Sequence, residues 1–290
     1  LFNVLLPSSL GFNQIKLKEF LKIVEQISSM DASTGWCFMC GATLNGAAGS
    51  FLPDEAIDHI FKKDKEHKNI IIAGQTAPKA TVKMKNGDIL ISGKFKFASG
   101  SKHANWIICG FIHPENKEHY LALIPSDKVK LTGGWNTIGL AGTGSVDFSL
   151  DEYKLSKNFI FPHDSFNPLR EKSYFSSGLV SIMLIGHVGV AVGLAKRALK
   201  EIKRIVLVNK TSGDHINRQD FQIEFARETS RLKAIDAYLI STLDNVEIAI
   251  SEKENLSEYI DAVRLASVFS TEECAKIIRF AYDRAGTHAI

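Results

Sequence analysis

The sequence has few cysteines and prolines, little net charge and no long uninterrupted apolar run. Four cysteines in 290 residues provide no disulfide framework. The 35 basic residues are nearly balanced by 32 acidic ones, and the basic run at 62–65 is broken by Asp64, so a nucleic-acid surface is not expected. The longest apolar stretch, Gly178–Leu194, is too short and too interrupted for a membrane span, and no secretory signal is visible. These absences favour a cytoplasmic globular protein that binds neither nucleic acid nor membrane.

Two of the cysteines, Cys37 and Cys40, form a CxxC pair inside an apolar helical pattern. A zinc site needs a second pair of ligands at a suitable spacing, and none follows. We therefore assign both thiols a structural role and expect no metal site.

Both ends of the chain are expected to be cut. The first residue is Leu1, and the helical pattern is still running at Ala289-Ile290. Chemistry that belongs to the whole protein is therefore expected to lie partly outside these residues.

The first of three zones, residues 1–68, has the period of helices. Apolar residues recur at three- and four-residue spacings along Lys16–Ile27. A second helix is predicted to begin near Ser33-Thr34 as an N-cap, and a third at Pro53, where proline suits a first turn.

In the second zone, residues 69–165, the period falls to two. Asn86-Gly87 separates two alternating runs and is a strong hairpin signal. Further strands are predicted at Trp106–Ile112, Tyr120–Ile124 and Val146–Tyr153. Glycine-rich turns between them predict a compact antiparallel β-domain, a barrel or sandwich.

The third zone, residues 166–290, returns to long helical patterns free of internal proline, over Phe175–Val208, Gln219–Ser251 and Ser257–Ala285. Helices of such length bury apolar faces on one another, so a bundle of the four-helix type is predicted. The polar segment Lys210–Asn217 reads as a loop. The fold class is therefore α+β: an N-terminal helical domain, a central β-domain and a C-terminal bundle.

This order of zones, together with four local segments, resembles the acyl-CoA dehydrogenase superfamily. Asp31–Trp36 resembles its D-x-S-x-x-W segment, and Gly139–Ser145 resembles G-x-x-G-T-G-S. Phe97–Trp106 resembles the F-x-S-G-x-x-H-x-x-W segment of the flavin-dependent monooxygenase-like branch. Asp261–Ile290 resembles a late helix of the type-2 C-terminal domain. The family's first and last helices would be absent from this chain.

The resemblance implies a flavin cofactor, FAD or FMN, lying with its N5 edge against the loop 97–106. The implied cofactor-binding residues in this loop are Phe97, Ala98, Ser99, Gly100, Ser101 and Trp106, and the implied catalytic residues are Ser99, Ser101 and His103. A flavin needs flat apolar walls and a few polar groups, and small residues let a backbone approach it closely. From physical chemistry alone, an ordinary turn between strands explains the same residues better.

Other candidates follow the resemblance more weakly. Thr76, Arg218, Gly286 and Thr287 would contact the cofactor, the last three in a neighbouring subunit. Trp36, Thr34 and His187 would line the substrate pocket. The competing interpretations are a core tryptophan for Trp36, a solvent-exposed arginine for Arg218 and, in the loop 97–106, a satisfied surface histidine for His103.

Two departures from the family pattern affect the predicted activity. Ala141 stands where relatives often have arginine, and the stretch Tyr174–Val192 contains no Asp or Glu. An acyl-CoA dehydrogenase needs a carboxylate to remove an α-proton. The leading hypothesis is therefore a reduced-flavin monooxygenase acting on a small apolar or aromatic substrate.

Two alternatives remain open: an acyl-CoA dehydrogenase proper, and a non-catalytic helical scaffold. The expected partners are a small-molecule substrate, a flavin reductase or electron-transfer flavoprotein, and further copies of the chain in a homotetramer, a dimer of dimers.

Overall fold

The computed structural model describes residues 1–62, 70–86, 88–170, 173–208 and 219–289. The chain divides into two compact units, Leu1–Lys16 with Trp36–Met183, and Leu17–Gly35 with Leu184–Ile290. Each unit is described by itself. The predicted division into domains 1–68, 69–165 and 166–290 stays a prediction.

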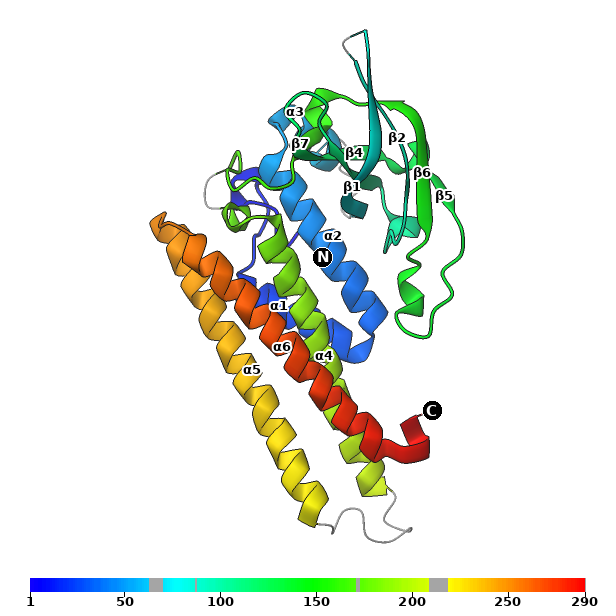
Figure 1. Cartoon of the computed structure of the whole chain (residues 1–290). Coiled ribbons are helices and arrows are strands. Elements are labelled where there is room, and N and C mark those ends of the chain that lie inside the picture. The colour runs from blue at the N-terminus through cyan, green and yellow to red at the C-terminus, as the bar shows by residue number, and fades with distance from the viewer. Residues whose placement is uncertain (63–69, 87, 171–172, 209–218, 290) are drawn as a thin grey trace. The chain divides into compact units, whose positions relative to one another are not determined.

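The first unit is built on a seven-stranded sheet in the order β5-β6-β2-β1-β3-β4-β7 (Figure 1). Every neighbouring pair is antiparallel except β1 and β3, which are parallel. The predicted antiparallel domain therefore contains one parallel pair, because the chain leaves β2 through the loop 96–105 and starts β3 beside the start of β1. The strands are β1 (Ile72–Lys85), β2 (Asp88–Phe95), β3 (Trp106–Ile112), β4 (His119–Pro125), β5 (Lys130–Thr132), β6 (Asp147–Lys154) and β7 (Ile160–Pro162).

The hairpin of β1 and β2 shows how the sequence sets the register. Lys85 pairs with Asp88, which leaves a two-residue turn, and Asn86 has the φ of +53° that such turns require. Alternate residues of β2 are buried, and Phe95 stacks on Phe148 of β6 with ring centroids 4.5 Å apart. Gly87, the other residue of the predicted turn, lies outside the described residues.

Helix α2 (Ala32–Phe51) supplies the main helical layer of the first unit from Trp36 onward, and α3 (Asp54–Ile57) follows it. Every residue from 41 to 50 is buried, which small side chains permit; a Cβ at Gly46 would lie 2.7 Å from the ring of Phe175. The predicted N-cap at Ser33-Thr34 is wrong. The carboxylate of Asp31 accepts a hydrogen bond from the Thr34 amide at 2.6 Å, so Asp31 caps the helix.

The second unit consists of long helices, and Figure 1 shows α5 and α6 running alongside each other. Gly178, with φ +84°, separates the helix α4 from a short 3₁₀ turn at Tyr174–Ser177, so α4 begins later than predicted. The predicted loop Lys210–Asn217 lies outside the described residues. The helices are α1 (Leu17–Met30), α4 (Leu179–Val208, whose first residues through Met183 belong to the first unit), α5 (Gln219–Glu252) and α6 (Ser257–Ala285).

A partly buried charge network joins three of these helices. Lys196 of α4 contacts Glu25 of α1 at 2.5 Å and Asp236 of α5 at 2.9 Å, and Lys22 also reaches both carboxylates. Burial alone would lower the pKa of Lys196, but the hydrogen bonds to Glu25 and Asp236 outweigh it and leave the pKa raised. The lysine therefore stays charged and holds the helices in register.

One helix among the described residues, Leu179–Leu207, is long and apolar enough to cross a membrane by length and composition. Of its most apolar window, 61% is buried within the structure, as in a core helix.

Asn45 of α2 joins the helix to the start of the sheet, and we expect Asn45→Ala to lower the free energy of unfolding by about 3 kcal/mol. Its amide donates to the Ile70 carbonyl at 2.7 Å and accepts from the Ile72 amide at 3.1 Å, and both backbone groups are buried. Chemical denaturation measures the change. Asn116→Ala, in an exposed turn, is the control and should change it by less than about 0.5 kcal/mol. Equal effects of the two substitutions would contradict the prediction.

Candidate functional site

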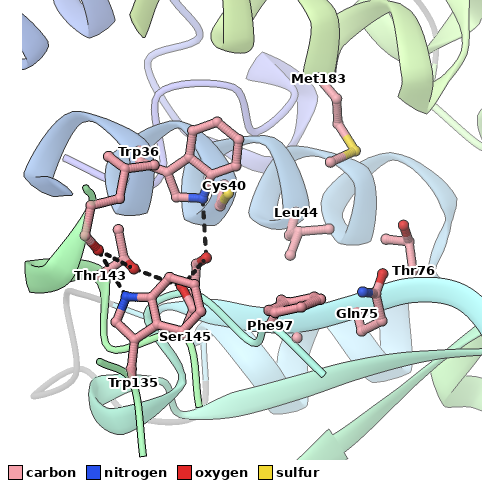
Figure 2. Close-up of a pocket in the computed structure, with 13 residues that line it drawn as sticks. Trp36, Cys40, Leu44, Gln75, Thr76, Phe97, Trp135, Thr143, Ser145 and Met183 are labelled. Atoms are coloured by element: carbon pink, nitrogen blue, oxygen red, sulfur yellow. Dashed lines mark hydrogen bonds between the residues drawn. The ribbon is translucent and has the colours of Figure 1, made fainter. Parts of the chain in front are cut away.

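A cavity of about 300 Å³ opens within the first unit, at the lower end of the range for small-molecule sites. Figure 2 shows residues of α2 on one side and residues of β1 and of the loop after β2 on the other. The lining residues are Trp36, Cys40 and Leu44 from α2, Gly74, Gln75 and Thr76 from β1, Phe97 and Ser99 from the loop 96–105, Trp135, Leu140, Thr143 and Ser145 from the segment between β5 and β6, and Met183.

The α2 side of the cavity is a single helical face. Trp36, Cys40 and Leu44 are four residues apart, so their side chains lie one above another. Burial raises the pKa of the Cys40 thiol to about 12, so this group stays a protonated, uncharged part of the wall.

The β1 side is shaped by a bulge. The register of β1 against β3 shifts on both sides of Pro78, which has no amide to give to the ladder. Two glycines allow the strands to approach: a Cβ at Gly74, whose φ is +140°, would lie 2.1 Å from the Ile108 carbonyl, and one at Gly110 would lie 2.1 Å from the Thr76 carbonyl. The bulged segment places Thr76 on the cavity wall.

A histidine pair holds this bulge from outside the cavity. Nε2 of His119 bonds the Thr76 carbonyl at 2.8 Å, and the ring stacks on His163 with centroids 4.1 Å apart. Burial, and then His163, lower the pKa of His119, which favours the neutral ring.

With Asp164, the two histidines place one potential metal-ligand atom each within 4.8 Å of the others. The rings lie only 16° from parallel, so their in-plane lone pairs do not converge on one point. Nδ1 of His163 is already bonded to the Asp164 carboxylate at 2.6 Å. We therefore interpret the group as a brace for Thr76.

Two lining residues other than glycine adopt the left-handed backbone region. Phe97 has φ +63° and Leu140 has φ +54°, conformations that cost free energy in such residues. Trp135 contacts both: its ring meets Phe97 edge to face at 6.0 Å, and its indole N–H donates to the Leu140 carbonyl at 2.9 Å. Strained residues of this kind often mark functional sites.

The two loops that contribute these residues are joined by backbone hydrogen bonds. The Ala98 amide donates to the Val146 carbonyl and the Gly100 amide to the Thr143 carbonyl, each at 3.0 Å. Gly100, with φ +78°, permits the turn that brings its amide to Thr143. The loops 97–103 and 139–145, both singled out in the sequence, therefore form one surface.

A chain of side-chain hydrogen bonds runs across this surface (Figure 2). The indole N–H of Trp36 donates to Ser99 Oγ at 3.0 Å, and Ser99 Oγ lies 2.7 Å from Ser145 Oγ. Ser145 Oγ lies 2.6 Å from Thr143 Oγ1, which donates to the Leu140 carbonyl at 2.8 Å. Thr143 and Ser145 are buried, whereas Ser99 is partly exposed on the cavity wall.

The structure brings together four of the predicted site residues on this cavity: Trp36, Thr76, Phe97 and Ser99. Ala98 and Gly100 are buried in the same loop behind the lining residues.

Three other residues predicted in this loop do not line the cavity. Ser101 is buried, and its hydroxyl has no hydrogen-bond partner among the described residues. His103 is exposed. Trp106 is buried at the start of β3, where it stacks on Phe159 with centroids 5.2 Å apart.

The remaining predicted residues belong to the second unit or are not described. Thr34 is exposed in the first turn of α2, and Gly286 and Thr287 follow the end of α6 in an exposed 3₁₀ turn. His187 lies on α4; the residue as a whole is exposed, yet partial burial of its ring lowers its pKa. Arg218 lies outside the described residues. The assigned roles of these residues stay predictions.

Sequence reasoning missed several lining residues. Cys40 and Leu44 could have been found from Trp36, since they follow it at steps of four on one helix. Thr143 and Ser145 stand in the segment 139–145, whose resemblance was noted without roles for its hydroxyls. Trp135 had no local signal, because its place depends on contacts with two other loops.

Comparison with known proteins supports the resemblance seen in the sequence. Residues 185–290 match the family described as acyl-CoA dehydrogenase, C-terminal domain. The chain is 28% identical over 298 residues to an indole-3-acetate monooxygenase of Acinetobacter baumannii, covering 100% of this chain and 75% of that protein.

A second relative and a solved structure extend this likeness. The oxygenase component of an FADH₂-dependent resorcinol hydroxylase of Rhizobium sp. is 27% identical over 68% of this chain and 50% of its own length. The structure of TdsC from Paenibacillus sp. A11-2, solved with FMN and indole, superposes with a TM-score of 0.81 at 15% identity, over 99% of this chain and 78% of TdsC.

The predicted fold class is confirmed: the chain has the fold of the acyl-CoA dehydrogenase superfamily. The predicted likeness to the flavin-dependent monooxygenases with this fold is confirmed as well.

The raised pKa of Cys40 predicts an unreactive thiol. At pH 8 the group is almost wholly protonated, and only the thiolate attacks alkylating reagents. We expect iodoacetamide to leave Cys40 unmodified in the folded protein and to modify it fully in denaturant, as measured by peptide mass spectrometry. Cys109, whose pKa burial also raises to about 12, should behave in the same way. Labelling of folded Cys40 at the rate of an exposed cysteine would show that its environment is different.

Proposed function

We propose that this chain is the oxygenase component of a two-component flavin-dependent monooxygenase, which takes reduced flavin from a separate reductase and transfers one oxygen atom of O₂ to a small aromatic substrate. The observation that carries the proposal is the cavity of aromatic and hydroxyl side chains in a chain with this fold. Two relatives point to the same chemistry, because one is an indole-3-acetate monooxygenase and the other a resorcinol hydroxylase, and both substrates are aromatic.

The residues present fit a flavin. Its flat tricyclic ring needs apolar walls and a few polar contacts, and the cavity offers Trp36, Phe97 and Trp135 with Ser99 and Thr76 among them. The hydroxyl of Ser101, buried without a partner among the described residues, is a further polar group in the same loop. When bound, the reduced flavin supplies the electrons that activate molecular oxygen.

The protein's own contribution is to position the reactants and exclude water. Leu44 and Met183 provide apolar cover, and the protonated Cys40 adds no charge. A dry wall of this kind limits side reactions of a reactive oxygen species. The fixed hydroxyl of Ser99 provides a polar contact of defined direction.

The described lining residues favour a monooxygenase over an acyl-CoA dehydrogenase. The dehydrogenase reaction needs a carboxylate within reach of the substrate's α-proton. No Asp or Glu is among the described residues that line the cavity. The remaining polar groups are hydroxyls, a thiol, an amide and indole N–H groups, none of which is a strong base.

The proposal includes the partners and the assembly. One relative is named an oxygenase component, a name that implies a separate reductase, so we propose a reductase as the partner of this chain. We propose that the chain and this reductase are both cytoplasmic. We also propose a homotetramer: Leu265, Val268 and Phe269 are 67%, 56% and 50% exposed and form an apolar stripe on α6 that a second copy would cover. Light scattering of the purified chain tests this assembly.

The function itself is tested by supplying reduced FAD or FMN from a flavin reductase, with O₂ and a panel of aromatic compounds that includes indole and phenols. We expect a product heavier by one oxygen atom, which carries label from ¹⁸O₂, and tight binding of one flavin in its reduced state. Mass spectrometry and anaerobic titration are the measurements. Failure to bind either flavin in either redox state at micromolar concentrations would overturn the proposal. Bleaching of a tightly bound oxidised flavin by an acyl-CoA would assign the dehydrogenase instead.

Leu44→Trp should close the cavity while the chain remains folded. The added ring volume projects from the α2 wall between Cys40 and the bulge, where a ligand would lie. We expect flavin or substrate affinity to fall at least tenfold, with a stability loss of about 1–3 kcal/mol from overpacking. Leu169→Trp, at a residue 63% exposed, is the matched control. Unchanged affinity in Leu44→Trp, measured by fluorescence titration, would place the ligand elsewhere.

A further inference from the structure

The hydrogen-bond chain from Trp36 to Leu140 has a fixed direction, and this direction decides what Ser99 can offer to the cavity. We propose that Thr143 and Ser145 are positioning residues that make Ser99 a hydrogen-bond acceptor, so that the cavity selects a ligand with a donor at this point. If the proposed function holds, on which this inference rests, the selected ligand is reduced rather than oxidised flavin.

Both ends of the chain are one-way groups. The Trp36 indole N–H can only donate, and the Leu140 carbonyl can only accept. Each hydroxyl between them has a single proton. Thr143 gives its proton to Leu140, so Ser145 must donate to Thr143, and Ser99 must donate to Ser145.

The opposite direction leaves an unfavourable contact. If Thr143 donated to Ser145 instead, its oxygen would face the Leu140 carbonyl oxygen at 2.8 Å with no proton between them. The indole of Trp135 and the backbone amide of Thr143 also donate to that carbonyl, at 2.9 Å and 3.1 Å, but their protons lie on other lines and cannot bridge the two oxygens. Water does not relieve the conflict, because Thr143 and Ser145 are only 2% and 4% exposed.

The result is a serine whose proton is already used. Ser99 donates to Ser145 and accepts from Trp36, which leaves one of its two acceptor positions. Ser99 lines the cavity, so this remaining lone pair is what it can present to a ligand. A ligand atom at this position must therefore carry an N–H or O–H.

The two redox states of flavin differ in this respect. In the central ring of oxidised flavin, N5 is a hydrogen-bond acceptor and N10 is blocked by the ribityl chain, and two-electron reduction turns N5 into an N–H donor. An acceptor at Ser99 would bond the reduced ring and would meet the oxidised ring lone pair to lone pair. A monooxygenase supplied with reduced flavin gains from this preference, because the spent, oxidised flavin is then the weaker ligand.

The experiment compares the dissociation constants of oxidised and reduced FMN and FAD, the latter under anaerobic conditions, for the wild type and two variants. Ser145→Ala removes the acceptor of the Ser99 proton. Thr143→Val lets Ser145 turn its proton toward Ser99. In both variants Ser99 regains a donor, so the preference for reduced flavin should fall roughly tenfold, the scale of one neutral hydrogen bond. The midpoint potential of the bound flavin should fall by about 30 mV, which is the same change for a two-electron couple.

Two controls separate direction from general damage. Thr143→Ser keeps the hydroxyl and should retain the wild-type ratio. Trp36→Phe removes the donor to Ser99 but leaves the Ser99 proton with Ser145. It should therefore weaken the binding of oxidised and reduced flavin equally and leave the ratio of their dissociation constants unchanged. Circular dichroism confirms that each variant is folded.

The outcomes distinguish this inference from the function on which it rests. Flavin binding with an unchanged ratio in both Ser145→Ala and Thr143→Val would overturn the inference and leave the proposed function intact. A wild type that binds neither form overturns both. If Trp36→Phe lost as much of the preference for reduced flavin as Ser145→Ala, that result would also contradict the inference, since the indole would then set the selectivity.

Discussion

The cavity depends on the joining of two loops that are distant in the sequence. Backbone bonds from Ala98 and Gly100 to the segment 143–146 hold the loops at a fixed spacing. That spacing brings Ser99 within 2.7 Å of Ser145, and the strained residues Phe97 and Leu140 are held in place on either side. Without this joining, the hydroxyl chain would be open to water and its direction would be lost. The site is therefore a property of the pair of loops.

The other two walls are fixed by contacts from outside the cavity. Asn45 hydrogen-bonds α2 to the backbone of Ile70 and Ile72 at the start of β1. These bonds fix the distance between the sheet and the helix that carries Trp36 and Leu44. His119, stacked on His163, holds the Thr76 carbonyl and so the bulge of β1. In each case a polar side chain, buried in Asn45 and partly buried in His119, satisfies a backbone group that an irregular segment leaves unpaired. Rigid walls of this kind reduce the ordering that a ligand must impose on binding.

The sequence predicted the parts of the fold that local patterns control. The bounds of α6 and the hairpin at Asn86 follow from periodicity and turn chemistry, and both agree with the structure. The start of α4 and the cap of α2 were misplaced, because Gly178 and Asp31 act through conformations that periodicity does not report. Ser99, expected as a site residue from the family resemblance of its loop, lies on the cavity wall.

Long-range contacts account for what the sequence could not supply. The partner of Trp106 is Phe159, more than fifty positions away, and this stacking places the indole in the core away from the cavity. His103 stands only four residues from Ser99, yet the short 3₁₀ turn Ser101–His103 carries it out to solvent. In a loop, a residue close in sequence to a site residue therefore need not line the same cavity, because the chain changes direction from one residue to the next.

A resemblance between sequences suggests that a loop meets a cofactor, but it does not say whether a serine in that loop gives or receives a proton. That property follows from counting donors along the path to the Leu140 carbonyl. The count needs residues from two loops and from α2, each unremarkable in its own segment. Because Thr143 and Ser145 are buried, water cannot compete for their hydroxyls and reverse the direction of these hydrogen bonds. A hydroxyl in a catalytic cavity is thus defined less by its own residue type than by the carbonyl at the far end of its hydrogen bonds.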